Sequence, residues 1–296
     1  MAAPRDPEEL DVRGTPPAEI DAATRMGAVQ LAVADLQRSL AYYVGSVGLE
    51  VLSEDGGRAS LGAGGVELLS LEELPGARPA DGFTGLYHFA LLVPERIDLA
   101  RWLAHAARTR VPLTGASDHF VSEAIYLRDP DHHGIEIYWD RPRALWEGQV
   151  ARMGTWPLDL DDLLAELPAR DEPFAGQPAG TTMGHVHLRV AEIDSTVRFY
   201  RDVLGFGLMA QLGPQAAFLS AGGYHHHVGG NVWESRGASP APDGFATLRG
   251  FTVLLPSDDA RERVLERLGA AGLAAGHGAV RDPSGNLLRL ELDPAS

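Results

Sequence analysis

The chain has 296 residues, of which 45% are hydrophobic and 22% are charged, and its formal net charge is −16 at pH 7. These values exclude a fibrous or disordered protein and are typical of one large or two ordinary globular domains. The negative charge argues against nucleic acid and anionic membranes as partners, because binding to either requires clustered basic side chains. The absence of cysteine excludes disulfides and thiolate ligands, so a metal would be held by His, Asp or Glu, and it fits a cytoplasmic protein.

The first 25 residues are polar and include several acidic side chains. They lack the apolar stretch of a signal peptide, and transit peptides avoid acidic residues, so we expect a polar tail. No run of about 18 apolar residues follows anywhere in the chain, so no segment is expected to span a membrane.

A pattern of strand, amphipathic helix and glycine-marked turn occurs twice. The first copy begins with the strand 28–33 (AVQLAV) and ends with Val47-Gly48-Leu49, and the second begins at 185–190 (HVHLRV) and ends with Leu204-Gly205-Phe206. The aromatic pairs Tyr42-Tyr43 and Phe199-Tyr200 lie at matching positions, where we expect them to anchor the helices in the core. Such self-similarity indicates a repeated structural unit.

A second pair of units follows each copy. The strands 88–94 (HFALLVP) and 250–256 (GFTVLLP) precede helix-patterned stretches at 97–110 and 258–270, and each unit continues to an Asp-Pro turn and an alternating strand. Further alternating segments lie at about 48–71, 113–139, 206–233 and 277–292. The chain thus contains four modules, numbered here in chain order, each with one helix and roughly four strands.

The modules divide the chain into two predicted domains, 26–140 and 183–296. Residues 141–182 are rich in Pro, Gly and acidic side chains and contain one short helical pattern at 158–167. We therefore predict that this segment connects the two domains.

Several strings indicate a family. The sequences GLYHFALLVP, SDHFVSEAIYLRDP, GIEIYWDRPRALW, FYRDVLGF and SAGGYHHHVGGNVW resemble the vicinal oxygen chelate superfamily, which includes glyoxalases, bleomycin resistance proteins and extradiol dioxygenases. They are most similar to the two-domain catechol 2,3-dioxygenase-like proteins. The resemblance covers about residues 27–140 and 184–293. It implies an α+β fold in which four βαβββ modules form two cup-shaped mixed sheets with helices outside.

In this superfamily, metal ligands come from the first and last strands of the modules. The two middle modules offer His88, Glu136 and His185 at these positions, whereas the outer two offer Ala28, Gly250 and Arg289. Pairing of modules in chain order would leave half a site in each domain. We favour the other arrangement, in which module two faces module three and the metal-facing nitrogens of the two histidines lie within about 4 Å of each other.

Two histidines and one carboxylate are the ligand set of non-haem Fe(II) oxygenases. The resemblance therefore implies an Fe(II)-dependent extradiol dioxygenase, in which a small aromatic diol binds the iron through both oxygens and reacts with dioxygen. A homodimer is compatible with this reading.

Further site residues follow from the same resemblance. His119 lies 31 residues after His88, and Tyr126 lies 10 residues before Glu136, as expected for partners of bound oxygen and of the substrate oxygen. An acid–base histidine is expected at His225 or His227. Strand alternation would place these two on one face and His226 on the other.

Other interpretations remain open at this stage. A glyoxalase-like isomerase or lyase would use His227 as a fourth ligand for Mn(II), Ni(II) or Zn(II), and a binding protein would sequester a drug or planar metabolite without turnover. The histidine run could be a solvated strand edge, and His187 is expected to support the ligands rather than to join them. His132-His133 stands where the family usually has Gly-Asn, and we expect a solvated loop there.

Overall fold

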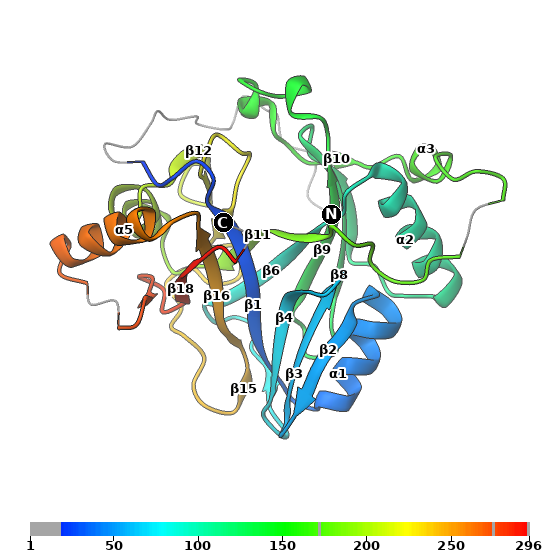
Figure 1. The fold of residues 1–296 in the computed structure, drawn as a ribbon, viewed down its shortest axis with the longest axis horizontal. Helices are drawn as coiled ribbons and strands as arrows, with labels where there is room; N and C mark the ends of the chain where they lie inside the picture. The colour runs from blue at the N-terminus through cyan, green and yellow to red at the C-terminus, as the bar shows by residue number, and fades with distance from the viewer. Residues whose placement is uncertain (1–18, 171–172, 274–275, 295–296) are drawn as a thin grey trace.

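The computed structural model describes residues 19–170, 173–273 and 276–294, and it has the α+β architecture expected from the modules (Figure 1). Two large mixed sheets run side by side, and the main helices lie on their outer sides. The buried apolar side chains of both sheets form one continuous core, which includes Leu31, Phe89, Val186 and Phe251.

The seven-stranded sheet joins modules one and four in the order β17-β18-β16-β1-β4-β3-β2. Its strands are β1 (Arg25–Val33), β2 (Glu50–Asp55), β3 (Arg58–Ala63), β4 (Val66–Glu73), β16 (Leu248–Leu255), β17 (Ala279–Arg281) and β18 (Leu287–Leu292). The first strands of the two modules, β1 and β16, pair antiparallel at its centre.

The nine-stranded sheet joins modules two and three in the order β10-β7-β8-β9-β6-β11-β14-β13-β12. Its strands are β6 (Gly85–Leu92), β7 (Gly115–Asp118), β8 (Ser122–Arg128), β9 (Gly134–Asp140), β10 (Trp156–Pro157), β11 (Thr182–Arg189), β12 (Gly207–Leu212), β13 (Ala216–Ser220) and β14 (Val228–Asn231). Here too the first strands, β6 and β11, pair antiparallel. The predicted pairing of module two with module three is therefore confirmed.

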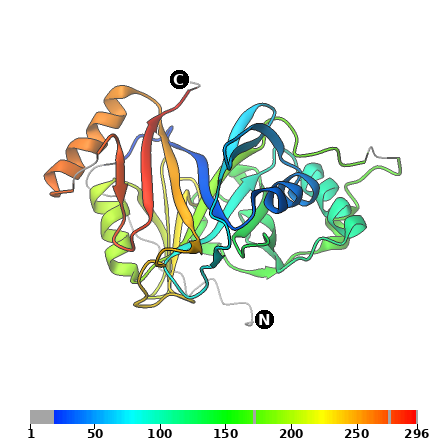
Figure 2. The ribbon, with the colours of Figure 1, turned by 90° about the horizontal axis from the view of Figure 1, so that it is seen from below.

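The helices pack within each half of the chain rather than across it. Figure 2 shows α1 (Leu36–Tyr42) and α2 (Arg96–Thr109) at one end of the molecule, and α4 (Ile193–Val197) and α5 (Asp258–Ala270) at the other. The Trp102 indole on α2 donates to the Ser46 carbonyl in the π-helical turn η2 (Tyr43–Val47). The Arg267 guanidinium on α5 donates to the Val203 carbonyl in the matching turn η5 (Arg198–Val203).

Shorter elements complete the fold. β5 (Arg78–Pro79) and β15 (Phe245–Ala246) form a two-stranded parallel sheet between the two halves. The connector contains η3 (Arg143–Leu145), η4 (Val150–Arg152), β10 and α3 (Leu160–Leu164). Because each large sheet takes one module from each half, the division of the chain into domains 26–140 and 183–296 stays a prediction.

Matching tyrosines fix the Asp-Pro turns of each half. Tyr43 donates to Asp129 at 2.9 Å, and Tyr200 donates to Asp282 at 3.1 Å. Both tyrosines are fully buried, as their repeat positions predicted. Module two is thus tied to module one, and module four to module three, through the turns rather than through the sheets.

The His132-His133 turn is only partly the solvated loop that we expected. His132 is half exposed and pairs with Asp81 at 2.8 Å. His133 is buried, and its Nε2 lies 2.9 Å from the Ala32 carbonyl oxygen. The expectation was wrong for His133 because this turn packs against the end of β1.

Within the described parts of the chain, no helix combines the length and apolar character needed to cross a membrane.

Candidate metal centre

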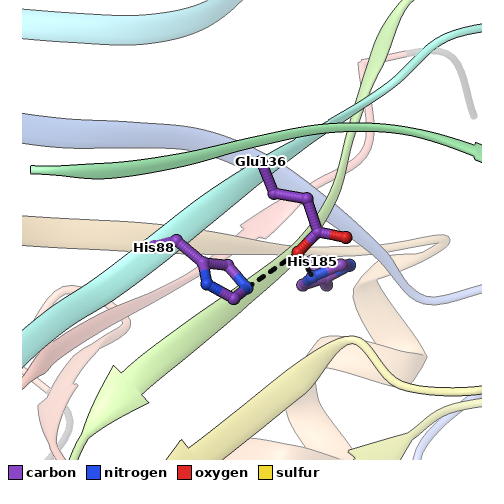
Figure 3. A group of neighbouring side chains, drawn as sticks. All are labelled: His88, Glu136 and His185. Carbon is purple, nitrogen blue, oxygen red and sulfur yellow. Dashed lines mark hydrogen bonds and ion pairs between the residues drawn. The ribbon is translucent and has the colours of Figure 1, made fainter. Parts of the chain in front are cut away.

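Three neighbouring strands at the middle of the nine-stranded sheet bring His88, Glu136 and His185 together (Figure 3). They lie on β6, β9 and β11 respectively, and all three are buried. One ligand atom from each residue lies within 4.8 Å of the other two. Both imidazoles point at the same carboxylate oxygen, with Nε2 of His88 at 3.0 Å and Nε2 of His185 at 3.2 Å from Glu136 Oε2.

Close approach of β9 to β6 depends on a glycine. A Cβ at Gly134 would lie 2.0 Å from the Tyr87 carbonyl oxygen and 3.0 Å from the His88 Cβ. A side chain at this position would push apart the two strands that carry His88 and Glu136. The glycine before IEIY is therefore part of what positions the site.

The electrostatics of this group fit a divalent cation. Burial lowers the pKa of His185 to about 4, so its imidazole is neutral near pH 7 and can offer a lone pair. Burial opposes ionisation of Glu136, but His185 and His88 outweigh it and hold the pKa of Glu136 well below its usual value. Nε2 of His88 is buried and makes no well-oriented hydrogen bond. Two imidazoles and a buried carboxylate that converge in this way are suited to coordinate a metal.

A cavity of about 680 Å³ opens onto this group, a volume within the range of small-molecule sites. Its walls include His88 and Glu136, together with His119, Tyr126, His187 and His226. A ligand in the cavity would therefore meet the proposed metal ligands directly.

The structure brings His119 and Tyr126 together beside Glu136, where the spacing placed them. Nδ1 of His119 donates to the Gly154 carbonyl at 2.6 Å, which leaves Nε2 to accept a hydrogen bond from the Tyr126 hydroxyl at 2.7 Å. Burial lowers the pKa of His119, and burial with the nearby Glu136 carboxylate raises the pKa of Tyr126 well above its usual value. Both groups are neutral at pH 7, and Tyr126 remains a proton donor.

The histidine run turns the opposite face to the cavity from the one that was predicted. His226 lines the cavity, whereas His225 and His227 do not. The prediction assumed a strand, but residues 221–227 form an irregular loop and β14 begins only at Val228. His227 is held away from the metal group, because its Nδ1 accepts a hydrogen bond from the Ala221 N–H. It is therefore not placed to serve as a fourth ligand.

His225 is linked to the cavity through its neighbour. Its Nε2 donates to the Asp140 carboxylate at 2.9 Å, and its Nδ1 lies 2.8 Å from Nδ1 of His226. The Tyr224 hydroxyl donates to the other Asp140 oxygen at 2.7 Å. Burial lowers the pKa of His226 well below its usual value, so its imidazole is neutral near pH 7. Donation from Nδ1 of His226 to Nδ1 of His225 leaves the Nε2 lone pair of His226 free.

Several cavity residues were not identified from the sequence. Met153, Gly154 and Thr155 belong to the connector, which runs along the edge of the nine-stranded sheet as β10 and closes one side of the cavity. Phe218 and Trp233 form an aromatic part of the cavity wall beside His187. The aromatic residues lie in module three near the histidine run, and this proximity in sequence could have identified them. Nothing in the sequence of the connector indicated that it lines the cavity.

The sequence and the fold agree with a known family. The model of the Glyoxalase/Bleomycin resistance protein/Dioxygenase superfamily matches residues 25–137 and 182–294. The two matched segments together cover most of the chain and coincide with its two halves. The chain belongs to this superfamily.

Individual relatives follow the same pattern. The chain is 42% identical over 257 residues to a catechol-2,3-dioxygenase of Bacillus subtilis (strain 168), an alignment that covers 84% of this chain and 89% of that protein. Its fold is similar to a "putative dioxygenase" from Bacillus subtilis subsp. subtilis str. 168, with a TM-score of 0.64, 16% identity and coverage of 94% and 87% of the two chains. It is also similar to glyoxalase I from Zea mays, with a TM-score of 0.55, 18% identity and coverage of 90% and 92%.

Proposed function

We propose that the protein is an Fe(II)-dependent extradiol dioxygenase that cleaves a catecholic aromatic compound. The observation that carries the proposal is the convergence of His88, Glu136 and His185 on a cavity large enough for a substituted ring. Two histidines and a carboxylate on one side of a metal leave its other positions open. The 42% identity to a catechol-2,3-dioxygenase supports the same reaction class.

Iron(II) held by these three residues would supply the positions at which a catechol and dioxygen meet. The protein's part is then to orient the diol, exclude water and move protons. Buried neutral groups around the ligands suit this task, because hydrogen bonds are stronger where water is excluded.

Tyr126 and His119 act as a pair in this proposal. The Tyr126 hydroxyl is a donor that can turn from His119 Nε2 to an oxygen of the substrate. His119 is held by its bond to the Gly154 carbonyl, so Nε2 stays directed at the same place and can accept or return a proton. The connector thereby fixes the orientation of a proposed catalytic imidazole.

His226 takes the acid–base position that the sequence assigned to its neighbours. Its free ring nitrogen, Nε2, belongs to a side chain that lines the cavity, and its ring centroid lies 4.1 Å from that of His185. We propose that Nε2 accepts the proton of a substrate hydroxyl. Asp140 and His225 would assist by keeping the other nitrogen protonated. Catalytic roles for His225 and His227 themselves stay predictions, and neither ring reaches the cavity wall.

The test begins with metal analysis of anaerobically purified protein and continues in an oxygen electrode with a panel of catechols. We expect stoichiometric iron, oxygen uptake and yellow semialdehyde-type products, and no reaction of methylglyoxal with glutathione. Iron-loaded protein that consumes no oxygen with any catechol, together with isomerase activity in the Ni(II) or Zn(II) form, would overturn the proposal.

Variants test the roles of the two hydrogen-bonding groups. His119→Phe and Tyr126→Phe should each lower turnover by about 10²–10⁴-fold, the effect of losing one positioned acid–base group, while iron content stays unchanged. His105→Phe is the matched control, since His105 lies on α2 and bonds to the Gly45 carbonyl instead. Turnover by the two test variants equal to that of the control would exclude both roles.

A further inference from the structure

The cavity is larger than an unsubstituted catechol needs, and the wall beyond the metal group is apolar. Val121, Met153, Leu212, Phe218 and Trp233 all line it. Val121 and Met153 belong to one buried cluster, and Phe218 packs against that cluster. These side chains come from five separate segments, so the fold assembles the surface rather than leaving it at a single loop.

This apolar wall is continuous with the metal group. The His187 ring lies 5.0 Å from His88, 5.6 Å from Phe218 and 5.8 Å from Trp233, measured between ring centroids. Phe218 also lies 5.2 Å from His226. A ring held at the metal would therefore direct a substituent along His187 toward Phe218 and Trp233.

The cavity offers no free cation for an acidic substituent. Arg128 is the one basic side chain apart from histidine in the described lining, and it already faces Asp81 at 3.5 Å and Glu234 at 3.6 Å. The buried Arg189 shares the same two carboxylates at 3.9 and 3.6 Å. Two guanidinium groups thus balance two carboxylates, so the charge of Arg128 is already paired and is not free to bind a substrate carboxylate. The chain has no lysine that could take over this role.

We propose that the substrate is a catechol with an uncharged, apolar substituent, and that Leu212, Phe218, Trp233 and Met153 bind that substituent. This inference rests on the proposed function and narrows it to one class of catechols. Arg128 is the only member of this charged cluster in the described cavity wall, and its pairing with Asp81 and Glu234 disfavours carboxylated catechols. The net charge of −16 acts in the same direction, since it repels anions that approach the protein.

The experiment compares catechol, 3- and 4-butylcatechol, and 2,3- and 3,4-dihydroxybenzoate, and takes the better member of each pair. Equilibrium binding to anaerobic metal-loaded protein is measured by calorimetry, and kcat/KM is measured by oxygen uptake. Each buried methylene should strengthen binding about fourfold, so the better butylcatechol should bind at least tenfold more tightly than catechol. Both dihydroxybenzoates should bind more weakly than catechol.

Two variants separate the apolar wall from the charged cluster. Trp233→Ala should reduce the ratio of butylcatechol to catechol affinity by about tenfold, whereas Leu145→Ala, at an exposed connector position outside the cavity, should leave the ratio unchanged. The double variant Asp81→Asn/Glu234→Gln frees Arg128 and should raise the affinity for the dihydroxybenzoates by about tenfold.

The outcomes distinguish this inference from the proposed function. Cleavage of catechol with equal or better binding of a dihydroxybenzoate than of the butylcatechols would overturn the substrate class alone. Iron-loaded protein that neither binds nor cleaves any catechol would overturn the proposed function, and this inference would fall with it.

Discussion

The two large sheets have the same construction, but among the residues that the structure describes, only the nine-stranded sheet carries a group that could hold a metal. Each pairs the first strands of two modules at its centre, β6 with β11 in one sheet and β1 with β16 in the other. At the positions of His88, Glu136 and His185, the seven-stranded sheet has Gly250, Arg289 and Ala28. Arg289 donates to Gln30, the counterpart of His187, at 3.3 Å. A guanidinium and an amide thus replace a carboxylate and an imidazole.

The comparison shows that strand pairing and chemistry are set by different residues. Apolar alternation, the tyrosines and the Asp-Pro turns shape both sheets alike, and the metal group adds only three side chains to that frame. The seven-stranded sheet keeps the frame without them, which indicates that its contribution is structural.

Removal of the His88, Glu136 or His185 side chain should have the largest effect, which is on iron binding. Ala replacement of His88, Glu136 or His185 should lower Fe(II) affinity by more than 100-fold, because even loss of a residue that only supports a ligand costs 10–100-fold. Iron content after anaerobic loading and dialysis measures the effect, and circular dichroism checks that each variant is folded.

The matching positions in the other sheet supply the control. Gln30→Ala and Arg289→Ala should leave iron content unchanged. Full iron occupancy in all three ligand variants, or a loss in the control variants, would place the metal elsewhere.

Acid should destabilise the nine-stranded sheet more than the seven-stranded sheet, and this effect is smaller than the loss of iron. No histidine occurs in the strands of the seven-stranded sheet, whereas burial lowers the pKa of His185 to about 4 and that of His227 to about 3 on the other side. The ordinary value in an unfolded chain is about 6.5, so the unfolded state binds more protons below that pH. The free energy of unfolding is therefore highest above pH 6.5 and falls as the pH decreases toward 4. The buried His185 alone lowers it by about 3 kcal/mol over this range.

Hydrogen exchange of metal-free protein can locate this loss. Amides of β6, β9 and β11 should lose protection between pH 6.5 and 4 before those of β1 and β16 do. Simultaneous loss in both sheets would mean that the buried histidines are not the acid-sensitive element.

The smallest expected difference is in the stability effects of substitutions in the two Asp-Pro turns. His132 and Gly285 occupy the same turn position with φ of 68° and 86°, which is the left-handed region. Gly285→Ala should destabilise the protein by about 1–2 kcal/mol, because its Cβ would also lie 2.7 Å from Pro240 Cγ. His132→Gly relieves the same strain and loses only the exposed pair with Asp81, so it should be neutral or stabilising by less than about 1 kcal/mol. Thermal unfolding compares the two, and equal destabilisation by both would contradict this account.

The sequence was sufficient to predict the fold because the repeat marks every module. Helices predicted at 97–110 and 258–270 are present as α2 and α5, and the first strands of all four modules are present. The pairing of modules was also predictable, since only the middle modules retained ligand-capable residues. Module four departs from the pattern: its described residues hold three named strands where about four were expected.

Prediction of the site was less complete for physical reasons. The three metal-group residues lie on regular strands, where side-chain direction alternates, and His119 and Tyr126 were assigned from their spacing in the family that the sequence resembles. His226 could not be assigned that way, because a loop with positive φ at Gly222 and Gly223 resets the direction of the chain before β14. The connector's contribution through Gly154 is a backbone carbonyl, and a backbone atom leaves no signature in residue type.

The pairing of β1 with β16 also dictates an order of assembly. Arg25 lies opposite Leu254, so the seven-stranded sheet joins the beginning of the described chain to its far end, whereas the nine-stranded sheet uses only strands between β6 and β14. A chain emerging from the ribosome can complete the nine-stranded sheet as soon as β14 has been made. Until β16 follows, β1 presents an unpaired edge, which is the kind of surface that promotes aggregation. The nascent protein would therefore assemble the strands that carry His88, Glu136 and His185 first, and would cover the free edge of β1 last.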